Sequence, residues 1–267
     1  MALIMGVLNV TPDSFSDGGR YADPDAAIAR GLQLAGEGAD IIDVGGEATG
    51  PRATPVSAEV ELARVMPVIE RLVAAGLAVS IDTTKAPVAR AAVRAGARYV
   101  NDVSGGLFDP AIGDAVGDAV YICGHLRGRS IRDVFGDESR PVAWTEVADE
   151  LAERLAALPE PVRARAWVDP GLGFGKGGDP ATNRALIAHA GDLGRRLGRP
   201  VVVGPSRKRF LRVELVRAGV ADPTELDLDR ASTAACLDAV RAGAHVVRVH
   251  AVGLLIETLG AEIAARR

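Results

Sequence analysis

Short apolar runs alternate along the chain with longer segments whose apolar residues recur at helical spacing. The runs are rich in Val, Ile and Leu and lack a polar face, as is typical of parallel strands that helices cover. Eight of them occur, at residues 3–9, 41–44, 78–82, 99–101, 119–123, 166–169, 201–204 and 245–250. We predict a buried parallel strand at each.

The amphipathic segments between these runs predict the helices. They lie at residues 26–35, 57–72, 87–95, 144–158, 180–197, 230–242 and 253–265. Ser57, followed by Glu59 and Glu61, is a candidate N-cap. A glycine of the kind that ends a helix in the left-handed conformation precedes several strands, at Gly38, Gly76, Gly96, Gly198 and Gly243.

Eight strand–helix units in 267 residues predict a single (β/α)8 barrel domain over residues 1–267. An open, doubly wound sheet is the alternative fold. No linker or change in composition marks an internal boundary. Residues 127–142 are charged and weakly periodic, and we expect a mobile loop there.

Composition and charge argue against several classes of function. The 31 basic and 35 acidic residues argue against a broad grip on nucleic acid. Cys123 and Cys236 define neither a disulfide framework nor a zinc site, and they suit a reducing cytoplasm. No apolar run has the roughly 18–20 residues of a membrane span. The apolar start lacks the basic residues of a signal peptide. We therefore expect a cytoplasmic protein with no membrane or nucleic-acid partner.

Polar side chains stand at or just after the carboxyl end of all eight predicted strands. In chain order they are Asn9, Asp43, Asp82, Asn101 with Asp102, His125 with Arg127, Asp169, Ser206 to Lys208, and Arg248 with His250. One such residue can simply mark the end of a strand, but eight of eight are poorly explained in this way. In a barrel these ends meet at one mouth, where the active site lies. Acids and amides with bases at the rim suit a polar heterocycle that carries an anion.

Motifs around these residues resemble the dihydropteroate synthases of the pterin-binding barrel family. They occur in family order over nearly the whole chain, at residues 5–19 (MGVLNVTPDSFSDGG), 42–47 (IDVGGE), 80–83 (SIDT), 101–105 (NDVSG), 169–176 (DPGLGFGK), 206–208 (SRK) and 248–250 (RVH). The resemblance implies that 6-hydroxymethyl-7,8-dihydropterin diphosphate and 4-aminobenzoate are joined, with Mg²⁺, to give 7,8-dihydropteroate and diphosphate. It also implies that a homodimer can form through helices of the barrel wall.

In the implied chemistry the diphosphate departs first and leaves a cation delocalised into the pterin ring, which the aniline nitrogen attacks. No protein nucleophile is needed. The protein must bind the pterin, stabilise the leaving anion and exclude water. Carboxylates near the ring also favour the cation electrostatically.

The resemblance assigns roles to individual residues. It places Asp82, Asn101, Asp169 and Lys208 against the pterin and implies that Asp82, Asp169 and Lys208 take part in catalysis. The other implied substrate contacts are Asp43, Thr49, Phe174, Ser206, Arg248 and His250. Of these, Ser206 is implied for the aminobenzoate carboxylate, and Arg248 and His250 are implied for the diphosphate.

Asn9 is implied as the ligand of magnesium and diphosphate. Each role has a structural alternative. Asp82 and Asp169 could cap turns, Asn9 could be a turn residue, and Arg248 could form a salt bridge at the barrel end. Whether His125 belongs to the site stays open. The glycine-rich run before Lys176 lacks the spacing of a phosphate-binding loop.

The chain departs from the family pattern mainly around the second substrate and the diphosphate. Residues 47–52 read Glu-Ala-Thr-Gly-Pro-Arg where the family has Glu-Ser-Thr-Arg-Pro-Gly, so Gly50 takes the arginine position and Arg52 follows two places later. Gly124 replaces a methionine, which should leave room above the pterin. Ala251 replaces an aspartate, and Arg212 a glycine. The alternative function is therefore a divergent paralogue that binds pterin but uses another amine, resists sulfonamides or lacks synthase activity.

Overall fold

Eight parallel strands form one sheet in the order β6-β5-β4-β3-β2-β1-β8-β7. The computed structural model describes residues 2–11, 23–50, 54–128, 131–134, 141–176 and 180–265. The strands are β1 Leu3–Asn9, β2 Ile41–Gly45, β3 Val79–Asp82, β4 Tyr99–Asp102, β5 Val120–Gly124, β6 Trp167–Asp169, β7 Val202–Val203 and β8 Val246–Val249. All eight predicted strands are confirmed.

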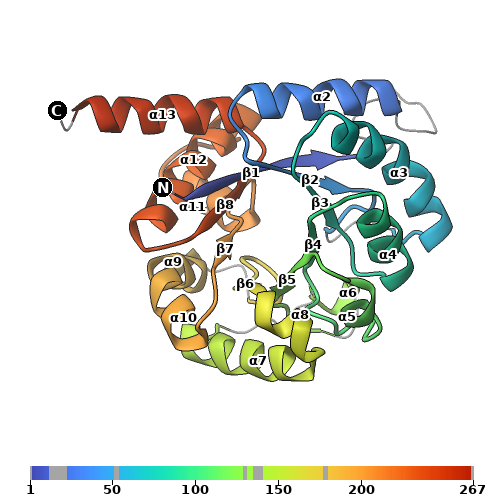
Figure 1. Ribbon diagram of the computed structural model, residues 1–267. Coiled ribbons are helices and arrows are strands. Elements are labelled where there is room, and N and C mark those ends of the chain that lie inside the picture. Colours follow the sequence, from blue (N-terminus) through green and yellow to red (C-terminus); the bar gives the residue numbers. More distant parts are fainter. Residues whose placement is uncertain are drawn as a thin grey trace.

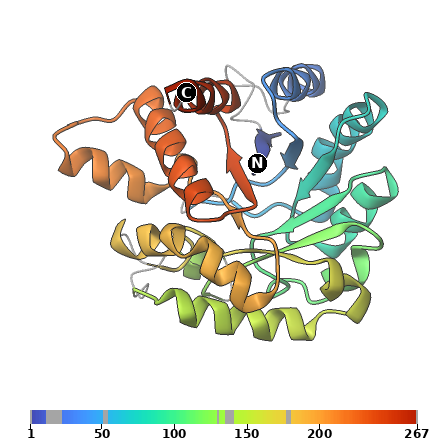
Figure 2. The same ribbon diagram turned by 60° about the vertical axis from the view of Figure 1, so that its left-hand side comes forward.

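The two ends of this sheet meet, so the strands form a ring. Val168 of β6 pairs in parallel with Val201, next to β7, and its backbone N–H donates to the carbonyl of Pro200 at 3.0 Å. Helices surround the ring in Figure 1, and the turned view in Figure 2 shows the same arrangement. The (β/α)8 barrel is confirmed, and the doubly wound alternative is wrong.

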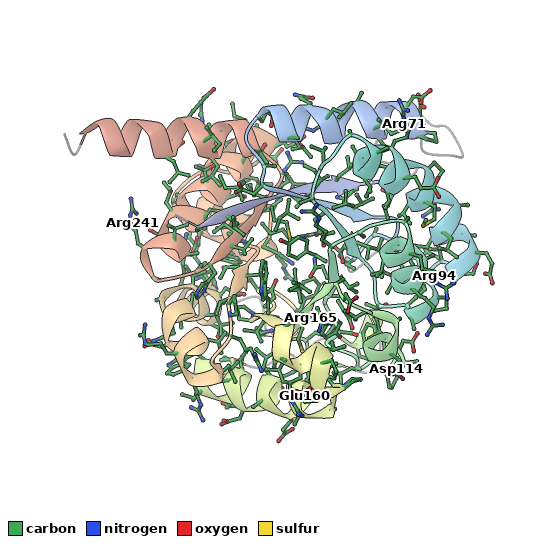
Figure 3. All side chains as sticks on the ribbon, in the orientation of Figure 1. Arg71, Arg94, Asp114, Glu160, Arg165 and Arg241 are labelled. Carbon is green, nitrogen blue, oxygen red and sulfur yellow. The ribbon has the colours of Figure 1, made fainter. Side chains whose placement is uncertain are left out.

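The helices pack on the outside of the ring. They are α2 Pro24–Gly36, α3 Ala58–Ala74, α4 Ala86–Arg94, α5 Ile112–Ala115, α6 Ile131–Val134, α7 Trp144–Ala157, α8 Glu160–Arg165, α9 Pro180–Ala188, α10 Ala190–Leu197, α11 Arg209–Arg217, α12 Glu225–Arg241 and α13 Val252–Ala265. Charged side chains such as Arg94 and Glu160 lie on the periphery (Figure 3). Among the residues that the structure describes, no helix combines the length and apolar character of a membrane span.

Most helix ends follow the sequence signals. Ser57 caps α3 by accepting from the N–H of Val60, and the five predicted glycines all have positive φ, from 62° at Gly198 to 107° at Gly38. The predicted helix at 180–197 is two helices that meet at His189. Helix α6 falls within the predicted loop 127–142, of which residues 129–130 and 135–140 lie outside the described residues.

The space beside Gly124 is filled, so the expectation that this glycine leaves room above a ligand is wrong. A Cβ added to Gly124 would lie 2.5 Å from the carbonyl oxygen of Asp102 and 2.6 Å from the Cα of Val103. The backbone after β4 occupies the position that a side chain would take. Gly124 therefore allows close packing of two neighbouring loops.

Gly124→Ala should lower the free energy of unfolding by roughly 1–3 kcal/mol, the usual cost of overpacking, because backbone rather than a flexible side chain must move. Gly36→Ala is a matched control, since a Cβ at Gly36 meets nothing within 4 Å and alanine favours a helix. Urea unfolding of both variants checks this. A Gly124→Ala protein as stable as the control would contradict the close packing.

Candidate active site at the barrel mouth

Inward-facing strand residues build the mouth of the barrel in layers. Met5, Ile41, Ile122, Val202 and Val246 form an apolar cluster with Tyr99 and Trp167. Residues two positions apart on a strand share a face. The next inward layer, toward the carboxyl ends, is therefore Val7, Asp43, Asn101, Gly124, Asp169, Gly204 and Arg248. An apolar floor thus lies beneath a polar layer.

Arg248 binds Asp43 of this layer and Asp82 at the end of β3. Its Nε donates to Oδ2 of Asp43 and its Nη2 to Oδ2 of Asp82, both at 2.5 Å. Asn101 donates through Nδ2 to the same Asp43 oxygen at 3.0 Å. A Cβ on Gly204 would lie 3.6 Å from the Cβ of Arg248, in ordinary van der Waals contact, so Gly204 lies beside the arginine. The salt bridge considered as the alternative for Arg248 is present, and it lies inside the predicted site.

Burial and neighbouring charges shift the pKa values of this cluster. Burial and, to a lesser degree, the charges of Asp43 and Glu61 raise the pKa of Asp82 to about 7 against the opposing effect of Arg248 and Lys208. Burial opposes the charge of Arg248, but Asp43 and Asp82 together raise its pKa above the ordinary value. Asp82 is therefore the acid of the mouth that titrates near neutral pH.

Lys208 follows β7 and Phe174 lies in the loop after β6, near Asp169. The Nζ of Lys208 lies 3.7 Å from the centroid of the Phe174 ring, in a cation–π contact. Burial lowers the pKa of Lys208 to about 8, and Arg248 adds to this effect. Burial raises the pKa of Asp169, while Lys208 and Arg248 act to lower it. One Asp169 oxygen accepts from the N–H of Gly171 at 2.6 Å, so the predicted turn is also present.

These contacts bring together the residues that the sequence predicted to share one site. Asp82 and Asn101 belong to the Arg248 network, and Asp169 and Lys208 shift the pKa values of one another. Asn9 is close by, because a Cβ on Gly45 would lie 3.7 Å from Asn9 Oδ1 and 3.8 Å from Asp82 Oδ2. The mouth is therefore a single polar cup.

Ser206 and His250 lie at the rim as a hydrogen-bonded pair. Ser206 Oγ lies 2.8 Å from Nδ1 of His250 and accepts from the His250 backbone N–H at 3.1 Å. Burial lowers the pKa of His250 to about 3, with Arg248 the next largest cause. The imidazole is therefore neutral at pH 7, and it can bind an anion only as a hydrogen-bond donor.

The loop after β2 borders the cup beside Thr49. A small hollow there is lined by Glu47, Thr49, Glu61, Asp82, Thr83, Thr84 and Lys85. Lys85 donates to Glu47 and, at 2.6 Å, to the buried Glu61. Sequence reasoning missed this Lys85 contact, since nothing in the helical pattern of α3 separates Glu61 from a surface acid. Arg52 lies outside the described residues.

Three other polar residues near the strand ends have structural partners. His125 points to α7, where its Nε2 lies 2.8 Å from Glu150, so it is not part of the cup. Asp102 accepts from Ser104, Gly106 and Tyr121. The Arg207 guanidinium binds both oxygens of Asp229 at 2.7 and 2.9 Å, so it joins the loop after β7 to α12.

The described residues contain no group of three or more His, Cys, Asp or Glu side chains that could hold a metal ion. The oxygen that the cup offers at its rim beside Asp82 is the amide oxygen of Asn9. Mg²⁺ prefers oxygen ligands and commonly takes most of them from water and substrate phosphates. The donor set therefore fits a magnesium ion that arrives with a phosphorylated substrate.

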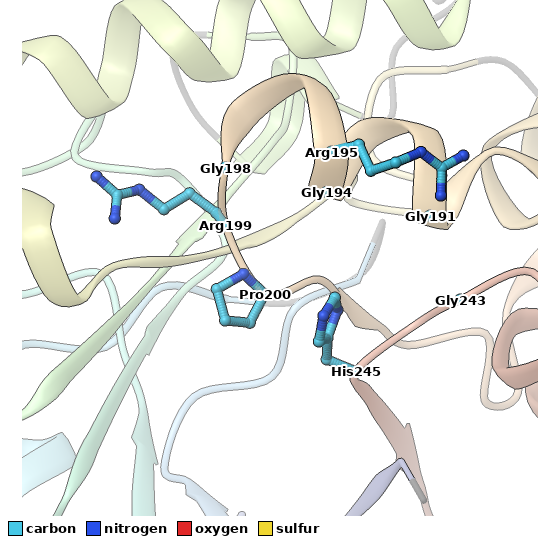
Figure 4. A pocket seen from close by; sticks show the side chains of 8 residues that line it. All are labelled: Gly191, Gly194, Arg195, Gly198, Arg199, Pro200, Gly243 and His245. Atoms are coloured by element: carbon cyan, nitrogen blue, oxygen red, sulfur yellow. The ribbon is translucent and has the colours of Figure 1, made fainter.

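A separate cavity of about 490 Å³ lies at the opposite end of the barrel, where β7 and β8 begin. It is lined by Gly191, Gly194, Arg195, Gly198, Arg199, Pro200, Gly243 and His245. Arg195 and Arg199 extend away from each other (Figure 4), and Arg195 is paired with Asp192. None of the predicted site residues lines this cavity.

Comparisons with known proteins agree with the composition of the cup. A family model described as "Pterin binding enzyme" matches residues 5–250. The dihydropteroate synthase of Mycobacterium leprae is 44% identical over 266 residues, which cover 96% of this chain and 90% of the relative.

Solved structures give the same result. A Xanthomonas albilineans dihydropteroate synthase with 4-aminobenzoic acid is 43% identical with a TM-score of 0.83, and the match covers 99% of this chain and 93% of that one. A second structure from this organism, in complex with 7,8-dihydropteroate, is 41% identical with a TM-score of 0.81, and the match covers 99% and 94%. The chain therefore belongs to the dihydropteroate synthase family of pterin-binding enzymes.

Proposed function

We propose that this chain condenses 6-hydroxymethyl-7,8-dihydropterin diphosphate with 4-aminobenzoate to give 7,8-dihydropteroate and diphosphate, a step of folate synthesis. The observation that carries the proposal is the single cup in which Asp82, Asn101, Asp169, Lys208 and Arg248 meet. The relatives that match nearly the whole chain at 41–44% identity are dihydropteroate synthases.

The pterin fits the side of the cup between Asn101 and Asp169. Asp169 uses one oxygen for Gly171, and its carboxylate can accept from the 2-amino group and the adjacent ring N–H of a pterin. Phe174 supplies an aromatic face nearby. When the diphosphate leaves, the cation that remains on the pterin is stabilised by the Asp82 and Asp169 carboxylates in a site of low dielectric constant.

The diphosphate fits the rim formed by Asn9, Arg248 and His250. Arg248 is held by two carboxylates before any substrate binds, so it is oriented in advance. His250 can donate one hydrogen bond while its Nδ1 faces Ser206. Mg²⁺ would bind the Asn9 amide oxygen and phosphate oxygens, and it would neutralise charge on the leaving group.

The second substrate fits the rim near Ser206 and Thr49, where the Ser206 hydroxyl would donate to the aminobenzoate carboxylate in place of Nδ1 of His250. Sulfonamides that mimic 4-aminobenzoate would compete there. The altered loop at residues 47–52 keeps the alternative of another amine open. The cytoplasmic location and the homodimer stay predictions.

An assay of both products tests the proposal and separates it from its alternatives. The protein is incubated with the pterin diphosphate, Mg²⁺ and 4-aminobenzoate, and diphosphate and 7,8-dihydropteroate are measured together. We expect both in equal amounts. Release of diphosphate that depends on a different amine, without pteroate, would favour the paralogue. Pterin binding without turnover would indicate a binding protein and contradict the proposal.

Asp169→Asn should weaken pterin binding by about 1–3 kcal/mol, or ~5- to 150-fold, because the amide presents a donor where two acceptors are needed. Titration of the intrinsic pterin fluorescence measures the Kd. Asp192→Asn is the control, since Asp192 is paired with His189 and Arg195 away from the mouth. Equal affinity in the two variants would place the pterin elsewhere.

The pH dependence of kcat/KM for the pterin substrate should be bell-shaped with a maximum between pH 7 and 8. Asp82, with its pKa raised by burial to about 7, is charged only above that pH. Lys208, with its pKa lowered by burial to about 8, is charged only below that pH. Asp82→Asn should remove the acidic limb from the remaining activity. An acidic limb that persists in this variant would belong to the substrate or to another group.

A further inference from the structure

The ammonium group of Lys176 is buried behind the cup, and the proposed function does not use it. Lys176 has no exposed surface. Its Nζ donates to three backbone carbonyl oxygens, of His125 at 3.1 Å, Gly171 at 2.7 Å and Phe174 at 3.0 Å. An ammonium has three N–H donors, so all are used within the protein. Lys176 therefore cannot bind a phosphate of the substrate.

These three carbonyls join the loops after β5 and β6. His125 directly follows β5, and Gly171 and Phe174 belong to the loop that begins at Asp169. The loops touch closely, because a Cβ on Gly171 would lie 1.7 Å from the His125 oxygen and 3.2 Å from Lys176 Nζ. The ammonium lies where these two backbone segments bring carbonyl oxygens together, and the Gly171 oxygen also accepts from the N–H of Phe174 at 3.1 Å.

The same loop carries two groups of the cup. Gly171 donates its N–H to Asp169, and the Phe174 ring lies against Lys208. Lys176 holds the carbonyls of these same two residues, Gly171 and Phe174. Burial lowers the pKa of Lys176 while the Asp169 carboxylate acts to raise it, and the Lys176 charge in turn lowers the pKa of Asp169 against the effect of burial. The position of this one ammonium thus determines the spacing between an acid and an aromatic ring of the cup.

The use of lysine in this chain is an independent indication. Of the 31 basic residues only three are lysines, at positions 85, 176 and 208. Lys208 lies on Phe174 in the cup, and Lys85 lines the hollow that borders Asp82. All three lysines therefore lie at or behind the mouth, whereas the arginines include both Arg248 of the cup and side chains on the periphery such as Arg94. An arginine presents a larger, planar fork, whereas the lysine ammonium is a compact group with three donors.

We infer that Lys176 is a positioning residue of the active site, whose compact ammonium sets the loop that presents Asp169 and Phe174 to the pterin. The inference rests on the proposed function. It adds to that function a group that touches no substrate but determines the geometry of two groups that do.

Arg154 offers a matched control. It is half-buried, and its guanidinium donates to the carbonyls of Ser104 at 3.4 Å, Gly124 at 2.8 Å and Leu126 at 2.5 Å. Arg154→Met therefore removes a cation from backbone carbonyls of the loop after β5, as Lys176→Met does, but leaves the bonds of Gly171 and Phe174 in place. The two variants should lose stability to a similar degree.

The experiment compares the Kd for the pterin diphosphate and the KM for 4-aminobenzoate in wild type and both variants. For Lys176→Met we expect a pterin Kd at least tenfold higher and a KM for 4-aminobenzoate within threefold of wild type. Arg154→Met should change the pterin Kd less than threefold. Equal changes in the two variants at equal loss of thermal stability would overturn the inference.

Lys176→Arg keeps the positive charge and is the second test variant if Lys176→Met does not fold. The pterin Kd should again rise at least tenfold, since the larger group displaces the Phe174 carbonyl, and an unchanged Kd would overturn the inference. Wild-type protein that makes no dihydropteroate would contradict the proposed function instead. Active wild type with normal variants would contradict only the role of Lys176.

Discussion

The ion pairs of one arginine across the barrel are the interaction on which the cup depends. Arg248 enters from β8 and binds Asp43 of β2 and Asp82 of β3, while Asn101 of β4 donates to the same Asp43 oxygen. A buried carboxylate without a partner costs roughly several kcal/mol. By pairing with both carboxylates, the guanidinium lowers the free-energy cost of burying two acids inside the barrel. Because β8 pairs with β1, beside β2 and β3, the polar layer can form only once the last strand of the chain has joined the first strands of the sheet.

The side of the cup around Lys208 is held by a cation–π contact instead of ion pairs. Its ammonium lies on the face of Phe174, a contact of roughly 0.5–2 kcal/mol, and burial lowers its pKa to about 8. Such a group moves, or loses its proton, at less cost than Arg248, which two carboxylates hold. The cup thus combines a rigid half, suited to a leaving anion, with a half that can adjust to a flat ring.

The sequence predicts the strands well because a buried parallel strand is a continuous apolar run, and it predicts the acids of the cup because strand ends converge. Packing between distant segments is not predictable in this way. Nothing local breaks the helical pattern at His189, where α9 and α10 meet. From the sequence alone, Gly124 suggests empty space at the end of β5, but the backbone after β4 occupies that space. The three carbonyls around Lys176 come from two loops, and no sequence motif indicates that these loops lie side by side.

Two aspartates with the same sequence signature show where such prediction ends. Asp102 and Asp169 each follow a buried strand, yet Asp102 accepts four hydrogen bonds from its own loop and from Tyr121, whereas Gly171 takes one oxygen of Asp169. The residue after Asp169 is Pro170, which has no N–H to donate. In the loop after β4, by contrast, Ser104 and Gly106 donate hydrogen bonds to Asp102. The donors in the following loop, rather than the acid itself, therefore decide whether a strand-end carboxylate serves the fold or a ligand.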